Sequence, residues 1–174
     1  MENLKEIFSS IKWFIMDVDG VLTDGSIIYD SEGRELKVFS VKDGMGITLL
    51  HRAGIKTAII TSRNSPMVQR RAGELGITEV IQGARDKLEL YFRLKEKEGF
   101  SDKEVLYIGD DYVDLPVMKV VGLPVTVPDA PVELKDTALY VTKRHGGKGA
   151  VREVAEMLLK AQGKFDEVIK TYTG

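Results

Sequence analysis

The sequence predicts an α/β fold: a doubly wound, Rossmann-like parallel sheet of about six strands with helices on both faces. Short apolar runs alternate with amphipathic stretches along the chain, as in a parallel sheet covered by helices. The apolar runs are rich in Val and Ile and end at Gly, Asp or Pro, which is typical of strands buried on both faces. The 174 residues suit one domain, so we expect a single domain over residues 1–174.

The elements follow one another in a regular order. The predicted strands are Trp13–Met16, Thr57–Ile60, Glu79–Ile81, Val105–Ile108, Val125–Val127 and Leu139–Val141. The predicted helices are Met45–Arg52, Pro66–Leu75, Arg85–Glu98, Val113–Val120 and Ala150–Ala161. Within the third helix, the apolar residues form a mostly one-sided stripe. A C-terminal tail at about residues 163–174 again has apolar residues at helical spacing, and we expect it to pack on its own subunit.

One segment interrupts the alternation. Ser26–Tyr29 and Glu35–Phe39 are strand-like, and the residues between them are turn formers, so we expect a projecting β-hairpin at about residues 26–39. Its apolar residues occur on both faces, and a two-stranded ribbon is only marginally stable alone. We therefore expect it to pair with the hairpins of sister subunits. The alternative is that it folds back on its own domain.

Composition excludes several functional classes. The 25 basic and 27 acidic residues leave a formal charge of −2, without the basic excess that nucleic-acid binding usually requires. The chain has no Cys, which excludes disulfides, a thiol nucleophile and a Cys-ligated metal. The apolar run near the N-terminus is too short for a signal peptide or a membrane span. We expect a soluble, cytoplasmic protein that acts without nucleic acid or membrane.

Two acidic groups follow predicted strands. Asp17 and Asp19 come directly after the first strand, and Gly20 indicates a turn that brings both carboxylates toward one pocket. The second group lies within residues 110–114, after the fourth strand. Either group alone also suits a surface loop or the first turn of a helix. Together, at one edge of a sheet and without Cys, they favour Mg²⁺.

Two further strand ends carry polar side chains. Residues 61–65 offer hydroxyl and guanidinium groups that can hydrogen-bond a phosphoryl group, with a plain helix cap as the alternative. Lys87 begins the helix after the third strand, and a lone Lys there is usually a solvated residue. Asp-x-Asp, Thr, Lys and Asp-Asp thus follow the strands in that order. This ordered set, from Trp13 to about Leu159, resembles the haloacid dehalogenase-type phosphohydrolase superfamily.

The resemblance implies covalent catalysis through an aspartyl-phosphate. Asp17 would be the nucleophile, and Asp19 would protonate the leaving alkoxide and then activate water. Thr61 would hydrogen-bond the phosphoryl oxygens. Lys87 would offset the charge of the nucleophile and the phosphate, because phosphoryl transfer depends mainly on positioning and charge neutralisation.

The resemblance also implies a metal site. Asp17, the backbone carbonyl of Asp19 and Asp110 would hold Mg²⁺, with waters and a phosphate oxygen completing the octahedron. Asp111 and Asp114 would act one step away, by orienting the catalytic lysine or a metal-bound water.

Finer motifs narrow the resemblance. The intervals from Asp17 to Thr61 and from Thr61 to Lys87 are too short to hold a cap domain. Residues 39–46, Thr-Ser-Arg at 61–63 with Arg71, and residues 145–153 look like the capless phosphatases that hydrolyse 3-deoxy-D-manno-octulosonate 8-phosphate for lipopolysaccharide precursors. The resemblance therefore implies a small sugar-acid phosphate as substrate. Members of this group are Mg²⁺-dependent homotetramers, so it also implies Mg²⁺ as cofactor and a homotetramer.

Such a substrate carries a carboxylate besides its phosphate and needs several cations. We expect it to contact residues that precede a helix or lie close to the phosphate site: Asp19, Lys42, Asp43, Gly44, Arg63, Arg71 and Lys87. Residues 145–149 also open a helix and either border the site or form a plain turn.

Other functions remain as alternatives. The substrate could be a nine-carbon sugar-acid phosphate, or the chain could be a noncatalytic phosphatase-like oligomerisation module. A two-component receiver domain also uses Asp, Thr, Lys and Mg²⁺, but its acidic pair and phosphoacceptor come in a different order. The tail could reach a neighbour's active site, as it can in the capless phosphatases.

Overall fold

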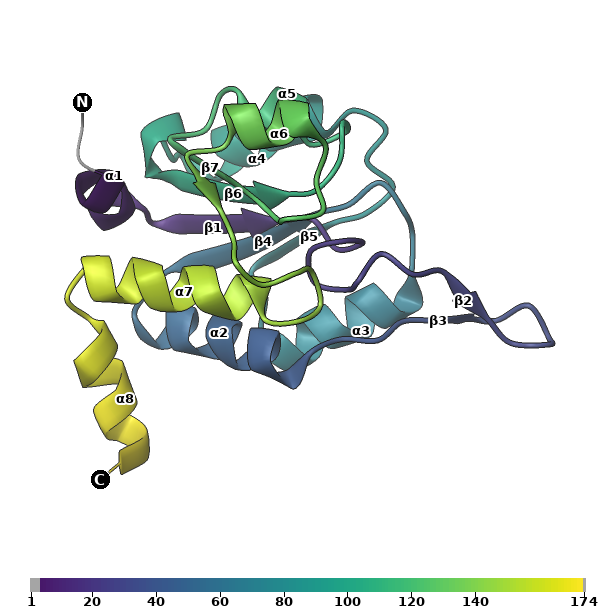
Figure 1. The fold of residues 1–174 in the computed structure, drawn as a ribbon, viewed down its shortest axis with the longest axis horizontal. Helices are drawn as coiled ribbons and strands as arrows, with labels where there is room; N and C mark the ends of the chain where they lie inside the picture. Colours follow the sequence, from purple (N-terminus) through teal and green to yellow (C-terminus); the bar gives the residue numbers. More distant parts are fainter. Residues whose placement is uncertain (1–3, 174) are drawn as a thin grey trace.

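A six-stranded parallel sheet forms the centre of the protein in the computed structural model, which describes residues 4–173. The strands lie in the order β5-β4-β1-β6-β7-β8 (Figure 1). Their bounds are β1 Trp13–Met16, β4 Lys56–Ile60, β5 Glu79–Ile81, β6 Val105–Gly109, β7 Leu123–Thr126 and β8 Tyr140–Val141. Ile15 of β1 pairs with Ala58 on one side and with Tyr107 on the other. The strand order therefore reverses at β1, where doubly wound sheets bind their ligands.

Helices cover both faces of the sheet, as predicted. Figure 1 shows α4, α5 and α6 on one side, and α2, α3 and α7 on the other. The helices are α1 Leu4–Ser10, α2 Val41–Arg52, α3 Pro66–Leu75, α4 Lys87–Glu98, α5 Leu115–Met118, α6 Val132–Thr137, α7 Ala150–Ala161 and α8 Phe165–Thr173, with a 3₁₀ turn at Asp102–Glu104. Gly76 and Gly99 end α3 and α4 in the left-handed conformation that an L-residue avoids.

Several boundaries differ from the predicted ones. The helix expected from Met45 begins at Val41, because the Ser40 hydroxyl accepts hydrogen bonds from the backbone N–H groups of Lys42 and Asp43. The helix expected over residues 113–120 covers only α5. The sequence patterns also did not predict α1 and α6, which are only seven and six residues long.

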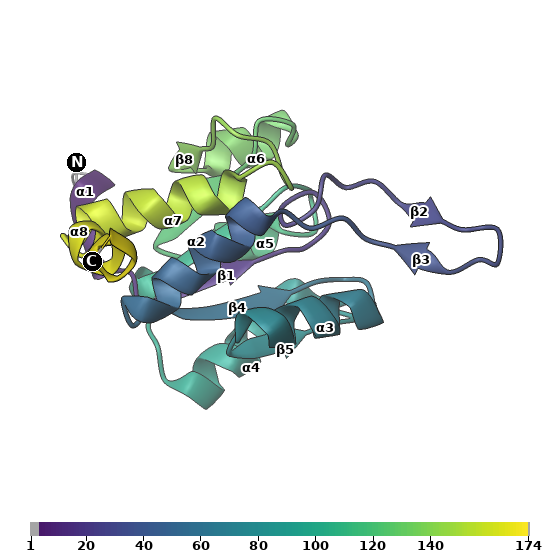
Figure 2. The same cartoon turned by 90° about the horizontal axis from the view of Figure 1, so that it is seen from below.

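The predicted hairpin is present and projects from the sheet (Figure 2). It consists of β2 (Ile28–Tyr29) and β3 (Glu35–Leu36), which pair antiparallel over shorter runs than expected. At its turn, the Asp30 carboxylate accepts hydrogen bonds from the backbone N–H groups of Glu32 and Arg34, at 2.9 and 2.8 Å. Its apolar side chains are 40–65% exposed: Ile27, Ile28, Tyr29, Leu36 and Val38.

The hydrophobic core lies on both faces of β1 and its neighbours. Phe14 and Ile15 have no exposed surface, and burying side chains of this size stabilises the fold by roughly 1.5–3 kcal/mol each. On one face, α7 buries Val154 and Leu158 and packs along α2. Over the described residues, no helix has both the length and the apolar character needed to cross a membrane.

Candidate active site

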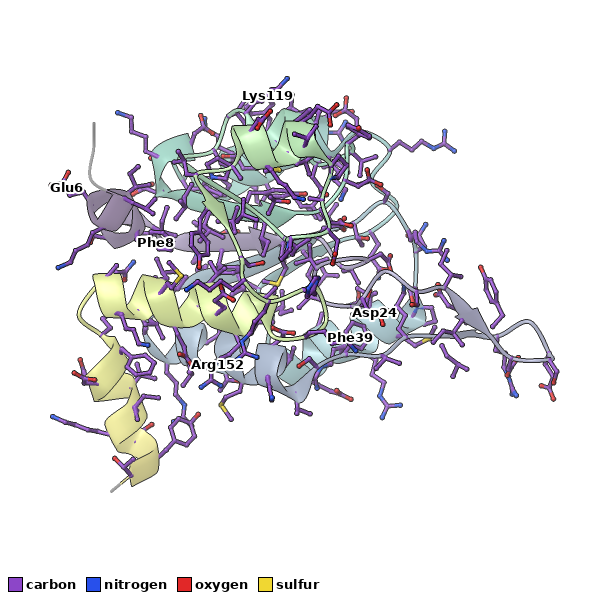
Figure 3. The ribbon with its side chains drawn as sticks, viewed as in Figure 1. Glu6, Phe8, Asp24, Phe39, Lys119 and Arg152 are labelled. Atoms are coloured by element: carbon purple, nitrogen blue, oxygen red, sulfur yellow. The ribbon has the colours of Figure 1, made fainter. Side chains whose placement is uncertain are left out.

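The predicted site residues meet at the carboxyl end of the sheet. Asp17 directly follows β1, Thr61 directly follows β4, and Asp110 directly follows β6. Because β4 and β6 flank β1, these three strand ends lie side by side. In Figure 3, Asp24 and Phe39 mark the region between this edge and the root of the hairpin.

Lys87 joins two carboxylates at the centre of the site. Its Nζ lies 2.7 Å from Oδ2 of Asp17 and 2.6 Å from Oδ1 of Asp114. The Lys87 side chain is 1% exposed, and α4 brings it there because the Asp86 side chain caps that helix by accepting a hydrogen bond from the Glu89 backbone. The other oxygen of Asp17 accepts a hydrogen bond from the Val18 backbone at 2.7 Å. A lysine that looks ordinary in the sequence is therefore buried within an ion-pair cluster.

Asp114 and Asp111 have different surroundings. Asp114 is fully buried and accepts hydrogen bonds from Lys87, from the Tyr107 hydroxyl at 2.6 Å, and from the backbone N–H groups of Asp110 and Asp111 at 3.0 and 3.3 Å. Its hydrogen bond to Lys87 is the contact that the predicted orienting role requires. The exposed Asp111 carboxylate instead accepts a hydrogen bond from the Tyr112 backbone at 2.8 Å. It makes no hydrogen bond to Lys87 among the described residues, so the metal-bound water stays the predicted partner of Asp111.

The electrostatics of the site leave negative charge to be neutralised. Burial first, and then the neighbouring Asp114, raise the pKa of Asp17 to about 6, although Lys87 opposes this shift. Burial, Asp17 and Asp114 raise the pKa of Asp110 to about 8. Burial disfavours the charged form of Lys87, but the two carboxylates raise its pKa above the usual value. One ammonium group therefore does not balance three close carboxylates.

This donor set fits a hard cation. One oxygen from each of Asp17, Asp110 and Asp114 lies within 4.8 Å of the others. Since the oxygens of Asp114 already accept four hydrogen bonds, Asp17 and Asp110 are the carboxylates with capacity for a metal. Carboxylate oxygens without nitrogen or sulfur donors suit Mg²⁺.

Residues 145–149 border the site. A Cβ on Gly20 would lie 1.9 Å from Oδ2 of Asp110, so the absence of a side chain lets that carboxylate approach. A Cβ on Gly146 would lie 1.8 Å from the carbonyl oxygen of Gly20, and the Gly147 N–H donates to the Val21 carbonyl at 2.9 Å. The glycines thus pack the segment directly against the turn that follows Asp19. A cavity of about 310 Å³ lies between them, lined in part by Asp110 and Lys148.

Asp19 belongs to a second ion-pair cluster at the root of the hairpin. Its carboxylate contacts the Lys37 ammonium group and lies 3.9 Å from Nε of Arg63. Nη2 of Arg63 donates to Oε1 of Glu35 at 2.7 Å. The buried Nε of Arg63 has no hydrogen-bond partner among the described residues. Asp19 and Arg63 were predicted from the sequence as site residues, but Lys37 and Glu35 were not. The only signal for those two was the alternation of charged residues 35 and 37 with apolar residues 36 and 38.

The other expected substrate contacts lie around the start of α2. The guanidinium group of Arg71 packs on Gly44, where an added Cβ would lie 2.4 Å from Nη2. Lys42 is exposed and lines a groove of about 590 Å³ along α7.

The prediction that residues 42–44 precede a helix is wrong, because α2 already begins at Val41. Asp43 lies inside α2, and its carboxylate accepts hydrogen bonds from the backbone N–H groups of Gly149 and Arg152, at 3.1 and 2.9 Å. Asp43 therefore uses its side chain to join α2 to the first turn of α7.

Comparisons with known proteins agree with this geometry. Residues 40–122 match the haloacid dehalogenase-like hydrolase family. The 3-deoxy-D-manno-octulosonate 8-phosphate phosphatase of Escherichia coli K12 is 49% identical over 158 residues, which cover 91% of this chain and 84% of that protein. The Haemophilus influenzae enzyme of the same name is 43% identical over 92% of this chain and 89% of its own length. The Moraxella catarrhalis phosphatase, solved with a magnesium ion, a phosphate ion and KDO, superimposes with a TM-score of 0.96 at 47% identity and covers 99% of both chains.

Proposed function

The chain belongs to the haloacid dehalogenase-like hydrolases, in the family of the 3-deoxy-D-manno-octulosonate 8-phosphate phosphatases, and we propose that it hydrolyses that sugar phosphate to 3-deoxy-D-manno-octulosonate and phosphate. It is a phosphomonoesterase. The observation that carries the proposal is the buried cluster of Asp17, Lys87 and Asp110 at the end of β1. This cluster pairs a carboxylate nucleophile with the positive charge that a phosphate dianion needs before it can approach.

In the first half of the reaction, Asp17 takes the phosphoryl group. A carboxylate oxygen of Asp17 attacks phosphorus, and the bond from phosphorus to the sugar oxygen breaks. The electron pair of that bond stays on the sugar oxygen, which takes a proton from the carboxyl group of Asp19. Lys87 offsets the negative charge that Asp17 and the phosphate bring together. Thr61, which is 1% exposed at the end of β4, would hydrogen-bond a phosphoryl oxygen.

In the second half, water releases the phosphate. The Asp19 carboxylate takes a proton from water as the water oxygen attacks phosphorus. The bond between phosphorus and Asp17 breaks, and its electron pair returns to the Asp17 carboxylate. Both side chains then have their starting protonation states. Asp114 keeps Lys87 directed at Asp17 through its hydrogen bond of 2.6 Å.

Mg²⁺ is the metal of this reaction. Asp17, Asp110 and the backbone carbonyl of Asp19 would hold it, and the positive charge it supplies when bound reduces repulsion between the nucleophile and the substrate phosphate. The raised pKa values of Asp17 and Asp110 support the need for a cation here. A magnesium ion in the Moraxella catarrhalis phosphatase supports its identity.

Arg63 and Arg71 would bind the carboxylate end of the substrate. The buried Nε of Arg63 has hydrogen-bonding capacity to spare, and Arg71 lies beside Gly44. We further propose that four copies of the chain assemble through their hairpins, so that each open site is covered by a neighbour. The reaction would take place in the cytoplasm, as a step toward lipopolysaccharide precursors.

Phosphate release from the sugar phosphate tests the proposal. The wild-type protein should release phosphate when Mg²⁺ is present and lose this activity when the metal is removed by a chelator. Asp17→Asn should abolish both turnover and formation of a trapped aspartyl-phosphate, whereas Asp136→Asn, an exposed control on α6, should retain both. Nine-carbon sugar-acid phosphates and simple aryl phosphates are assayed in parallel. Faster release from one of them, or substantial activity of the Asp17 variant, would contradict the proposal.

A further inference from the structure

Lys37 is buried at a position where the sequence suggests an exposed ribbon. Its side chain is 2% exposed, its ammonium group contacts a carboxylate oxygen of Asp19, and Nζ lies 3.5 Å from Oε1 of Glu35. Removing a lysine ammonium from water costs several kcal/mol unless carboxylates compensate for the lost solvation. The fold therefore places this cation specifically against the residue that would exchange protons during turnover.

The hairpin determines which side chains reach Asp19. Side chains alternate between the two faces of an extended chain. Leu36 and Val38 are 51% and 65% exposed on one face, whereas Glu35 and Lys37 turn inward on the other. The pairing of Tyr29 with Glu35 sets this register. A shift by one residue would exchange the two faces and remove Lys37 from the site.

Asp19 is held from two directions. Lys37 contacts Oδ1, and Nε of Arg63 lies 3.9 Å from Oδ2. Glu35 links the two cations, since Oε1 accepts a hydrogen bond from Arg63 at 2.7 Å and faces Lys37. The four side chains together carry no net charge. Such a network restricts the rotation of a carboxyl group that otherwise lies in a loop, with its side chain 22% exposed to water.

We propose that Lys37 is a positioning residue for the leaving-group step, which holds the carboxyl group of Asp19 where it meets the departing sugar oxygen. This inference rests on the proposed phosphatase function and adds a role for the hairpin within its own subunit. A group that transfers a proton must lie within hydrogen-bond reach of the atom that receives it. Without Lys37, the Asp19 side chain is free to turn toward Arg63 or toward solvent.

Two substrates with different leaving groups separate this role from a general loss of structure. A sugar alkoxide is a poor leaving group and needs a proton as the bond to phosphorus breaks. The 4-nitrophenolate of 4-nitrophenyl phosphate leaves without one. The value of kcat/KM reports the step that transfers the phosphoryl group to Asp17. Loss of proton delivery therefore lowers kcat/KM far more for the sugar phosphate than for 4-nitrophenyl phosphate. The ratio of the two kcat/KM values is independent of the amount of folded enzyme.

The test compares Lys37→Met, Lys37→Gln and Arg34→Met. Arg34 is the matched control, because it is a cation of the same hairpin that pairs with Asp30 at the turn. In both Lys37 variants, kcat/KM for the sugar phosphate should fall by about 10²-fold, which is the lower end of the rate enhancement that a general acid supplies. The value for 4-nitrophenyl phosphate should change only slightly. Arg34→Met should leave the ratio of the two values unchanged.

Other outcomes would overturn the inference. Equal losses of kcat/KM on both substrates would show that Lys37 serves phosphate binding or the fold. Lys37 variants with wild-type kcat/KM on both substrates would show that Lys37 has no role in the reaction. In an Asp19→Asn background, Lys37→Met should cause no further loss on the sugar phosphate. An additional loss there would show that Lys37 acts independently of Asp19. If the wild-type protein releases phosphate from neither substrate, the proposed function itself is wrong.

Discussion

At the scale of single residues, the site separates two aspartates that lie two positions apart. Asp17 is buried at the end of β1 and pairs with Lys87, which comes from α4. Asp19 lies beyond the strand and pairs with Lys37, which comes from the hairpin. Identical side chains with different partners can perform different chemical steps. This separation suits the two proposed roles, because each carboxylate is held in its own place by its own lysine.

Gly146 offers a test of how closely the site is packed. An alanine there would place Cβ 1.8 Å from the carbonyl oxygen of Gly20, a residue whose Cα lies against the Asp110 carboxylate. We expect Gly146→Ala to lower kcat/KM roughly 10²-fold, because a displacement of about 1 Å in a catalytic site has effects of this size. The variant should need more Mg²⁺ to reach half of its maximal activity. It should also need more Mg²⁺ for the same rise in melting temperature.

Gly73→Ala is the control for this variant. Gly73 lies in α3 with no neighbouring atom within 4 Å of its added Cβ, and alanine favours a helix. Its activity and metal dependence should match the wild type. A Gly146→Ala protein with the wild-type Mg²⁺ dependence would show that residues 145–149 do not support the metal site.

At the scale of elements, the hairpin has two faces with different chemistry. The inward face carries Glu35 and Lys37 to the site, whereas the outward apolar residues are exposed. Each strand pairs over only two residues, which is little internal stabilisation for a projecting ribbon. An exposed apolar surface on such a ribbon favours contact with another chain. This supports the proposed assembly through hairpins.

Charged residues on the outward face should disrupt that assembly. We expect the double variant Ile28→Asp and Val38→Asp to dissociate the proposed tetramer in sedimentation velocity and to raise KM for the sugar phosphate. The metal site should stay intact. Val132→Asp on α6 is the control, because Val132 is 61% exposed, close to the 65% of Val38. An unchanged tetramer would show that the hairpin is not the interface, and a monomer with normal kcat/KM would refute a shared site.

At the scale of the whole molecule, the two ends of the described chain join the same body. The Gln162 side chain, just beyond α7, donates a hydrogen bond to the Ile11 carbonyl at 2.8 Å. Near the C-terminal end of the described residues, α8 buries Val168. The centre of the Tyr172 ring in α8 lies 4.2 Å from the guanidinium carbon of Arg52 in α2. These contacts tie both terminal helices to the layer formed by α2 and α7. We propose that the chain is a single domain.

A single domain should unfold in one step. Trp13 is the only tryptophan of the chain and is 3% exposed in β1, so its fluorescence reports on the centre of the sheet. Urea unfolding followed by this fluorescence and by far-ultraviolet circular dichroism should give coincident transitions at a fixed protein concentration. Two separated transitions would show that part of the chain folds independently.

Local patterns in the sequence determined the sheet and the centre of the site. Four elements, β1, β5, α3 and α7, have the predicted bounds. The two strands are short, mainly apolar runs with polar residues just beyond them, and the two helices have apolar residues at helical spacing with Pro or Gly at their starts. Parallel strands also bring their carboxyl ends to one edge. For that reason the order of Asp17, Thr61 and Asp110 along the chain was enough to place them together.

Only the tertiary structure determined which partners these residues have. Lys37 lies 18 positions from Asp19 in the sequence. Asp43 lies 106 positions from Gly149, whose backbone N–H donates a hydrogen bond to the Asp43 carboxylate. The sequence pattern around Lys37 is the same whether its face of the hairpin meets water or a carboxylate. Such contacts depend on how separate elements pack, and no local periodicity encodes that packing. The sequence therefore identified the chemistry at the strand ends, whereas the tertiary structure decided which cations and helix ends hold the carboxylates there.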